Sequence, residues 1–337
     1  MQLFPFQDSW WIYAGFTGAV LVLLAVDLGV FHRQTRMVSI REAAVWSAVW
    51  VSLALVFCLG LYYYASWKLA SDPRLLVQPG FNPDTAARDT ALEFLTGYLV
   101  EYSLSLDNLF IFVLIFTFFG IPAPDQHRVL FYGILGALVF RSVFIALGAA
   151  LLQVHWLVLL FGGFLIVTGL KMMFTPQTGL NPERNPVIRL FRRMVPVTHE
   201  LHGPRFFVRL NRIPHATPLF VTLLCVEITD VIFAVDSVPA IYAVTNEPLI
   251  VFTSNVFAVL GLRALYSLVA GMLHRFHLLR YGLAVVLIFV GLKMVGLNEW
   301  FGGKVPISLS LGVIATAILL SILASLLSPP PKRGSGP

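Results

Sequence analysis

Apolar stretches of about twenty residues recur from one end of this chain of 337 residues to the other. A helix of that length crosses the ~30 Å hydrocarbon core of a lipid bilayer. Only 12% of the residues are charged, against roughly 25% in soluble domains. The sequence therefore predicts an all-α polytopic membrane protein with a single transmembrane domain over residues 1–337 and about nine spans. The predicted spans are 10–31, 43–66, 92–118, 129–153, 156–173, 215–244, 249–273, 280–297 and 306–327.

The basic residues are distributed unevenly among the loops between these spans. If nine spans alternate, nearly all loop arginines fall on one side, half of them in the Arg- and Pro-rich linker 174–214. Basic loops remain in the cytoplasm, so the N-terminus is predicted outside and the C-terminus inside. A net charge of +6 placed in this way indicates a lipid bilayer as the partner and argues against nucleic acid. The tail 328–337 is predicted to be disordered because of its composition.

Two segments, residues 92–173 and 215–297, carry the same order of charges. In each, two acids six residues apart are followed by an arginine, a histidine and a Gly-Leu-Lys-Met sequence, and the arginine precedes the lysine by 30 residues. These members are Glu101, Asp107, Arg141, His155 and Lys171 in the first copy, and Asp230, Asp236, Arg263, His277 and Lys293 in the second. Because each copy has three spans, an odd number, the second is predicted to lie inverted in a 3+3 core, as in many secondary transporters.

Several charged residues fall inside the predicted spans. The acids are Glu101, Asp107, Glu227, Asp230 and Asp236, and the bases are Arg141 and Arg263. A charge at the bilayer centre costs about 2.5–3.5 kcal/mol on insertion scales, so these side chains are expected to point inward. The acids outnumber the arginines, which favours a cation site completed by a divalent ion and a proton over a self-neutralised lattice of ion pairs. Protons that replace the metal would produce antiport.

Other residues could complete or control such a site. Asn108 and Asn255 are candidate neutral ligands, or else make ordinary hydrogen bonds between helices. Pro239 is a candidate break in span 215–244, and the carbonyl that it frees beside Asp236 is a candidate ligand or hinge. Glu93, at the start of span 92–118, is expected to be a helix-start charge. No histidine lies mid-span and the two cysteines are far apart, so magnesium, calcium or manganese is favoured over zinc or copper.

Four motifs carry a resemblance to a known family. They are VDLGVFHR at 26–33, EYSLSLDNLFIF at 101–112, EITDVIFAVDSVPAI at 227–241 and RALYSL at 263–268. With them the chain resembles the TerC family, named for tellurite resistance, which includes the Alx proteins and belongs to the LysE-like transporter superfamily. The resemblance implies a manganese exporter of the bacterial inner membrane, with the five acids above as its functional residues. Asp27, in the first motif, is a candidate gate or a helix-end charge.

These observations together predict a secondary transporter rather than an enzyme. It would export a divalent cation, Mn²⁺ by resemblance, from the cytoplasm through a midplane carboxylate site in exchange for protons. Mn²⁺ would be the transported ion, with no permanently bound cofactor. The alternative is an assembly factor that aids the maturation of membrane or secreted proteins, with the linker 174–214 as its docking surface.

Overall fold

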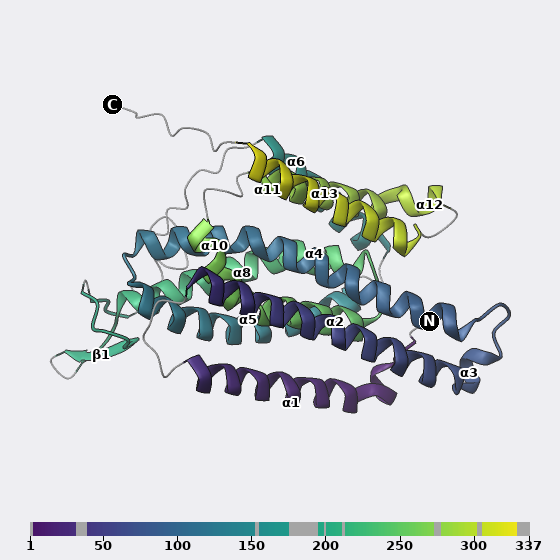
Figure 1. The fold of residues 1–337 in the computed structure, drawn as a ribbon, viewed down its shortest axis with the longest axis horizontal. Coiled ribbons are helices and arrows are strands. Elements are labelled where there is room, and N and C mark those ends of the chain that lie inside the picture. Colours follow the sequence, from purple (N-terminus) through teal and green to yellow (C-terminus); the bar gives the residue numbers. More distant parts are fainter. Residues whose placement is uncertain are drawn as a thin grey trace.

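The computed structural model describes residues 3–31, 39–151, 155–174, 195–198, 200–210, 213–272, 278–301 and 305–328. Within these ranges the chain is a bundle of long helices with one small hairpin at one end (Figure 1). Eight of these helices are long and apolar enough to cross a membrane, or nine spans result if one bent pair is joined. The prediction of an all-α polytopic membrane protein is confirmed.

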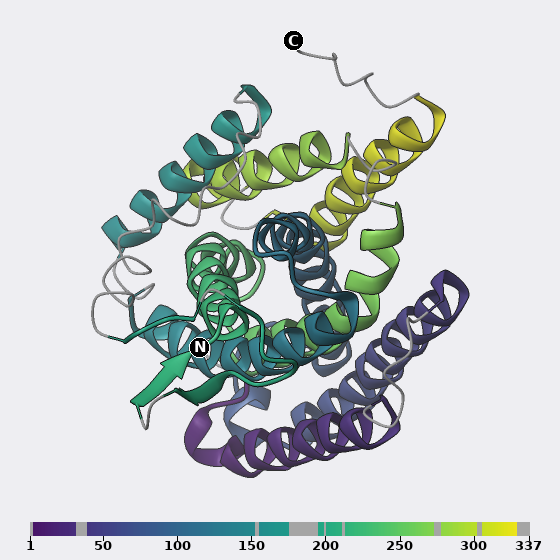
Figure 2. The ribbon, with the colours of Figure 1, turned by 90° about the vertical axis from the view of Figure 1, so that its left-hand side faces the viewer.

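The helices follow the predicted spans closely. They are α1 (Phe6–Phe31), α2 (Ile40–Ala70), α3 (Pro73–Leu76), α4 (Pro83–Phe118), α5 (Ala123–Leu151), α6 (His155–Phe174), α8 (Pro218–Tyr242), α9 (Pro248–Leu260), α10 (Leu262–Met272), α11 (Leu279–Leu292), the π-helical turn η3 (Lys293–Leu297), α12 (Asn298–Trp300) and α13 (Ile307–Leu327). Viewed along the bundle in Figure 2, α4 and α8 lie in the middle, with α1 and α2 on one side and α6, α11 and α13 on the other.

Helix α4 begins well before the predicted residue 92. Asn82 caps it by accepting hydrogen bonds from the N–H groups of Asp84 and Thr85, and Pro83 occupies the first turn, where a missing N–H costs nothing. Glu93 therefore lies inside the helix and is only 6% exposed. The prediction that Glu93 is a helix-start charge was wrong.

The end of the predicted linker is a hairpin of β1 (Phe207–Leu210) and β2 (Ile213–Ala216), paired antiparallel. Helix α8 starts after it at Pro218, where the fixed φ angle of proline suits a first helical turn. The predicted span start at residue 215 was therefore a few residues early. Residues 175–194 of the linker and 329–337 of the tail lie outside the described part of the chain.

Two helices differ in continuity from the predicted spans. The predicted span 249–273 is bent, and the predicted span 215–244 continues through its candidate break at Pro239. Helices α9 and α10 meet at an angle of 43° around Gly261, a residue type with poor helix propensity. Helix α8 instead runs through Pro239 to its end. Pro239 therefore does not end the helix, although its ring removes the hydrogen bond to the carbonyl of Val235, and its role as a hinge stays a prediction.

The two copies of the repeated unit pack on each other reciprocally. Helix α4 contacts α9 while α5 contacts α8, and α6 packs against α11. A methyl group on Gly169 of α6 would lie 2.8 Å from the carbonyl oxygen of Ala284, and one on Gly291 of α11 would lie 2.6 Å from that of Gly162. Gly169 thus lies opposite Ala284, seven residues before Gly291, and Gly291 lies opposite Gly162, seven residues before Gly169. Because later positions on one helix face earlier positions on the other, α6 and α11 run antiparallel. A two-fold axis between the copies would give this pattern, and the inverted repeat stays a prediction.

We expect Gly169→Ala to lower the apparent melting temperature in detergent, because an added methyl group has no space against the α11 backbone. Overpacking of this kind costs about 1–3 kcal/mol. Gly163→Ala on the same helix is the matched control, since nothing lies within 4 Å of its added methyl group. Equal melting temperatures for the two variants would contradict the close packing of α6 on α11.

Candidate functional site

Four helices bring charged and polar side chains together around Arg141 of α5. The Nη2 and Nε atoms of Arg141 donate to Asp230 Oδ1 and Oδ2 on α8, at 2.8 and 3.2 Å. The Nη1 atom donates to Glu101 Oε1 on α4 and to Asn255 Oδ1 on α9, the latter at 3.4 Å. We call these four residues the Arg141 cluster. Its Arg141–Asp230 ion pair joins the first copy of the repeated unit to the second.

The Arg141 cluster is fully removed from the surface. The side chains of Arg141 and Asp230 are 1% and 4% exposed, and that of Glu101 is 0% exposed. Buried charges must be paired, and the planar guanidinium satisfies Asp230 with two parallel hydrogen bonds. One guanidinium, however, faces two carboxylates. An additional positive charge or a proton would therefore balance the cluster.

Polar atoms of the cluster remain without a partner among the described residues. They are Glu101 Oε2 and Asn255 Nδ2, and Ser105 Oγ lies unpaired one turn further along α4. Buried polar groups are nearly always hydrogen-bonded, so unsatisfied ones point to water, protons or ions that bind there. Glu101 Oε2 and Ser105 Oγ are the oxygen type that hard divalent cations prefer.

Glu227 lies against α5 beside the cluster. A methyl group on Gly136 would lie 2.1 Å from Glu227 Oε1, so the carboxylate packs directly on this glycine. The Oε2 atom of Glu227 is buried and has no partner within the described part of the chain. Glu227 and Asp230 both face α5, as their spacing of three residues on one helix predicts. Glu227 therefore extends the negative charge of the cluster along α5.

The structure describes some of the other predicted residues only in part. Asp107, Asp236 and Asp27 lie in α4, α8 and α1, but their side chains fall outside the described part of the structure. Asn108 is buried in α4, and Arg263 is buried at the start of α10, just after the bend.

Among the side chains that the structure does describe, no three acids, histidines or cysteines gather closely enough to hold a metal ion. The convergence of Glu101, Asp107, Glu227, Asp230 and Asp236 on one cation therefore stays a prediction. Within the described set, the Arg141 cluster brings two of the five acids onto one guanidinium.

A narrow pocket, with room for about one water molecule, reaches Asp230 from one direction. Its other walls are apolar and come from α4, α5, α8 and α10, among them Phe112, Gly133, Val226 and Leu262. On α5 and α8 these residues precede Arg141 and Asp230, and on α4 they follow Glu101. The pocket therefore lies between the cluster and the end of the bundle that carries the hairpin (Figure 1).

A second buried polar group, which sequence reasoning missed, lies toward the opposite end. Thr245 donates to Glu93 Oε2 at 2.5 Å, and the N–H of Glu247 donates to Thr245 Oγ1 at 3.2 Å. Glu93 and Glu247 are each 6% exposed. Glu247 precedes Pro248 and looks in the sequence like a solvent-exposed residue at a helix start, so no local pattern reveals its burial.

We expect Arg141→Met to destabilise the protein by about 3–5 kcal/mol, because it leaves two buried carboxylates without a cation. The triple variant Arg141→Met, Glu101→Leu, Asp230→Leu should recover most of that loss, since no buried charge of the cluster remains. Both effects can be measured by denaturation in detergent micelles.

The surface variant Arg74→Met is the control for these measurements. It removes the ion pairs of Arg74 with Asp8 and Asp72 at the protein surface, where the Arg74 side chain is 53% exposed, and each such pair contributes about 0–1 kcal/mol. If the triple variant were as unstable as Arg141→Met, the prediction would be wrong. The ion pairs of the cluster would then themselves stabilise the fold.

Comparison with known proteins places the chain in one family. The sequence model of the family described as "Integral membrane protein TerC family" matches residues 86–333 of this chain. An uncharacterized membrane protein of Myxococcus xanthus is 47% identical over 328 residues, which are 97% of this chain and 95% of that protein. A protein of Escherichia coli K12 named "Putative membrane-bound redox modulator Alx" is 41% identical over 314 residues, 93% of each chain.

A membrane protein of Rickettsia bellii is 35% identical over 320 residues, 95% of this chain and 97% of that protein. No solved structure matches the chain. The identities extend over nearly the whole length, including the helices that carry the Arg141 cluster. The chain is therefore a multi-pass membrane protein that belongs to the TerC family.

Proposed function

We propose that the protein is a secondary transporter that exports a divalent cation, Mn²⁺, from the cytoplasm in exchange for protons. The observation that carries this proposal is the Arg141 cluster, in which two fully buried carboxylates share one guanidinium. A cluster that served only to hold helices together would be expected to balance its charges. A cluster that binds and releases a cation has to be electronegative when the cation is absent.

The ligand chemistry supports a hard divalent ion. The candidate ligand atoms are the carboxylate oxygens of Glu101, Glu227 and Asp230, with Ser105 Oγ as a neutral donor, and Asp107 and Asp236 lie on the same helices. Oxygen ligands suit Mg²⁺, Ca²⁺ and Mn²⁺, and disfavour Cu⁺ or Zn²⁺. Within that class we favour Mn²⁺ because of the resemblance to the TerC family. Cys58 and Cys225 form no disulfide with each other, and neither is part of the proposed site.

Proton exchange follows from the same charges. When the cation leaves, the excess carboxylates of the cluster are stabilised by binding protons, because an unpaired buried carboxylate is costly. Arg141 acts as a fixed counter-ion that keeps the remaining carboxylate ionised. Arg263, buried at the start of α10, is proposed to balance charge in the second copy, and Pro239 and Asp27 are proposed hinge or gate positions.

We place the protein in the bacterial inner membrane with its N-terminus outside and its C-terminus in the cytoplasm. The positive-inside distribution of arginines supports this orientation. The hairpin end of the bundle is then cytoplasmic, and the pocket that reaches Asp230 lies on the cytoplasmic side of the cluster. An exported ion would enter from that side.

In proteoliposomes that carry a pH-sensitive dye, we expect Mn²⁺ movement coupled to proton movement in the opposite direction. Asp230→Asn and Glu101→Gln should each reduce the Mn²⁺ flux at least tenfold, because each removes one of the charges that attract the cation. Glu299→Gln is the control, since Glu299 is an exposed acid in α12 and should leave the flux unchanged.

Wild-type flux that persists in Asp230→Asn and Glu101→Gln would refute the cation site. The alternative function, an assembly factor, predicts a different result in cells. Deletion of residues 175–194 from the linker would then abolish function, while both acid variants would remain active.

A further inference from the structure

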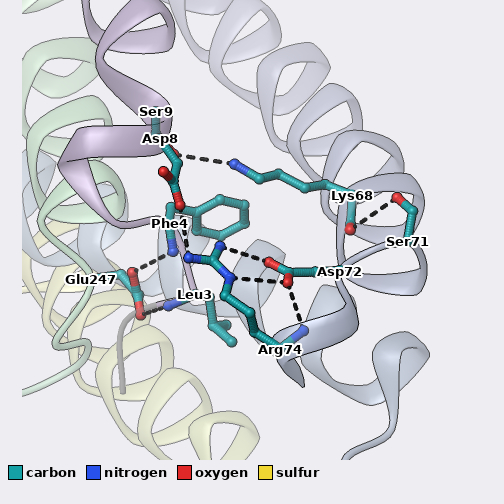
Figure 3. A network of polar contacts seen from close by, with 9 residues as sticks. All are labelled: Leu3, Phe4, Asp8, Ser9, Lys68, Ser71, Asp72, Arg74 and Glu247. Carbon is teal, nitrogen blue, oxygen red and sulfur yellow. Dashed lines mark hydrogen bonds and ion pairs between the residues drawn. The ribbon is translucent and has the colours of Figure 1, made fainter. Parts of the chain in front are cut away.

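The first described residues of the chain are bound by a buried carboxylate that lies far away in the sequence. Glu247, in the turn between α8 and α9, accepts hydrogen bonds from the N–H groups of Leu3 and Phe4, at 2.5 and 3.2 Å (Figure 3). Burial raises the pKa of Glu247 above its ordinary value, and the two N–H groups oppose that shift. The N-terminal segment thus compensates in part for the cost of burying this carboxylate.

The Phe4 side chain packs into a small hydrophobic core at the same end of the bundle. This side chain is 0% exposed and belongs to an apolar cluster with Leu69, Leu75, Ala87 and Leu249. These residues come from α2, α3, α4 and α9. Phe4 therefore touches the elements that surround the first turn of α9, on the side away from the hairpin.

Two basic residues, one from α2 and one from α3, bind the first turn of α1, which follows Phe4 in the chain. Lys68 Nζ lies 5.6 Å from the centroid of the Phe4 ring and donates to Ser9 Oγ at 3.2 Å. Arg74 pairs with Asp8 at 2.8 Å (Figure 3). We call residues 3–9 the N-terminal latch. It joins the start of α1 to α2, α3 and the α8–α9 turn.

A line of buried polar and small residues leads from the latch toward the Arg141 cluster, between α4 and α9. It begins at Glu247, Thr245 and Glu93, which are linked by the hydrogen bonds described above. One turn further along α4, a methyl group on Gly97 would lie 2.9 Å from Ser254 Oγ. Ser254 adjoins the cluster residue Asn255. The line thus consists of polar and small residues, and it is closed at Gly97 by direct contact between the two helices.

The two directions away from the Arg141 cluster therefore differ. Toward the hairpin end a pocket reaches Asp230, whereas toward the opposite end the helices touch and the latch covers their ends. We propose that the latch is the outer gate of the transport pathway, so that an exported ion leaves between α4 and α9 only after Glu247 releases Leu3 and Phe4. This inference rests on the proposed function, because it supposes that an ion leaves the cluster in that direction.

The latch is suited to reversible opening. Helix α1, which continues it, lies at the edge of the bundle, and only 22% of the residues in its apolar stretch are buried (Figures 1 and 2). When the latch opens, Glu247 gains water, so part of the desolvation cost is recovered as the hydrogen bonds to Leu3 and Phe4 are lost. The Asp8–Arg74 pair is exposed and stabilises the closed state only weakly.

Access to the line beneath the latch can be measured without any metal. In a cysteine-free background with Ser254→Cys as the reporter, a membrane-impermeant maleimide is applied outside intact cells. We expect Phe4→Ala and Glu247→Gln each to increase the labelling rate at least tenfold, because each loosens the latch. Asp84→Asn, an exposed acid at the start of α4, should label at the parent rate.

Parent-like labelling in both latch variants would overturn the proposal, as would labelling of the reporter only from the cytoplasmic side in inverted vesicles. Because labelling involves no ion transport, this result stands even if Mn²⁺ proves not to be the substrate. Neither result depends on how the Arg141 cluster functions.

A second experiment keeps the latch residues that bind Glu247 intact. Asp8→Cys and Arg74→Cys, whose parent side chains are in contact, can be bridged by a short reducible bis-thiosulfonate. We expect Mn²⁺ flux in proteoliposomes to fall at least tenfold on bridging and to return after reduction, whereas either single cysteine variant should be unaffected by the reagent. Full flux through the bridged protein would refute a gate that has to open.

Discussion

The centre of this bundle depends on one buried guanidinium. Arg141 binds Glu101 on α4 and Asp230 on α8, and these residues belong to different copies of the repeated unit. In hydrocarbon neither carboxylate can be left unpaired, so α4, α5 and α8 have to stay within side-chain reach of one another. The Glu227 carboxylate lies against Gly136 of the same helix α5. The requirement for pairing also makes the contact between the copies depend on charge.

Under the proposed function, this dependence would connect ion binding with movement. A cation that bound Glu101 and Asp230 would draw on the same oxygens that tie α4 and α8 to Arg141. Binding would therefore weaken the ionic contact between the copies while satisfying the charges that formed it. The α6–α11 contact is of a different kind, because backbone atoms approach each other at Gly169 and Gly291 with no space for a side chain. We infer that any motion between the copies is greater at α4, α5, α8 and α9 than at α6 and α11.

Much of the architecture could be predicted from the sequence because a bilayer imposes a strict length on apolar helices. The spans, the charged residues inside them and the placement of Glu227 and Asp230 on one face follow from hydropathy and helical periodicity. The burial of Glu93 did not follow, because the polar start of α4 gives no apolar signal and only the Asn82 cap marks its true beginning. The bend at Gly261 and the continuous helix at Pro239 depend on tertiary packing, which overrides local propensity.

The N-terminal latch shows most clearly what a single sequence leaves open. Leu3 and Phe4 bind Glu247 through backbone N–H groups, which every residue except proline has. No residue pattern therefore predicts this contact between positions more than two hundred residues apart in the sequence. What the sequence does show is an asymmetry of charge between the two ends of the bundle. The arginine-rich end borders the pocket, and the arginine-poor end carries Glu93, Glu247 and the latch. A cation that moved from the first end to the second would pass from a side where basic loops repel it to a side where buried carboxylates attract it. Release would then require those carboxylates to be hydrated or protonated, and the latch is the element whose opening admits the water.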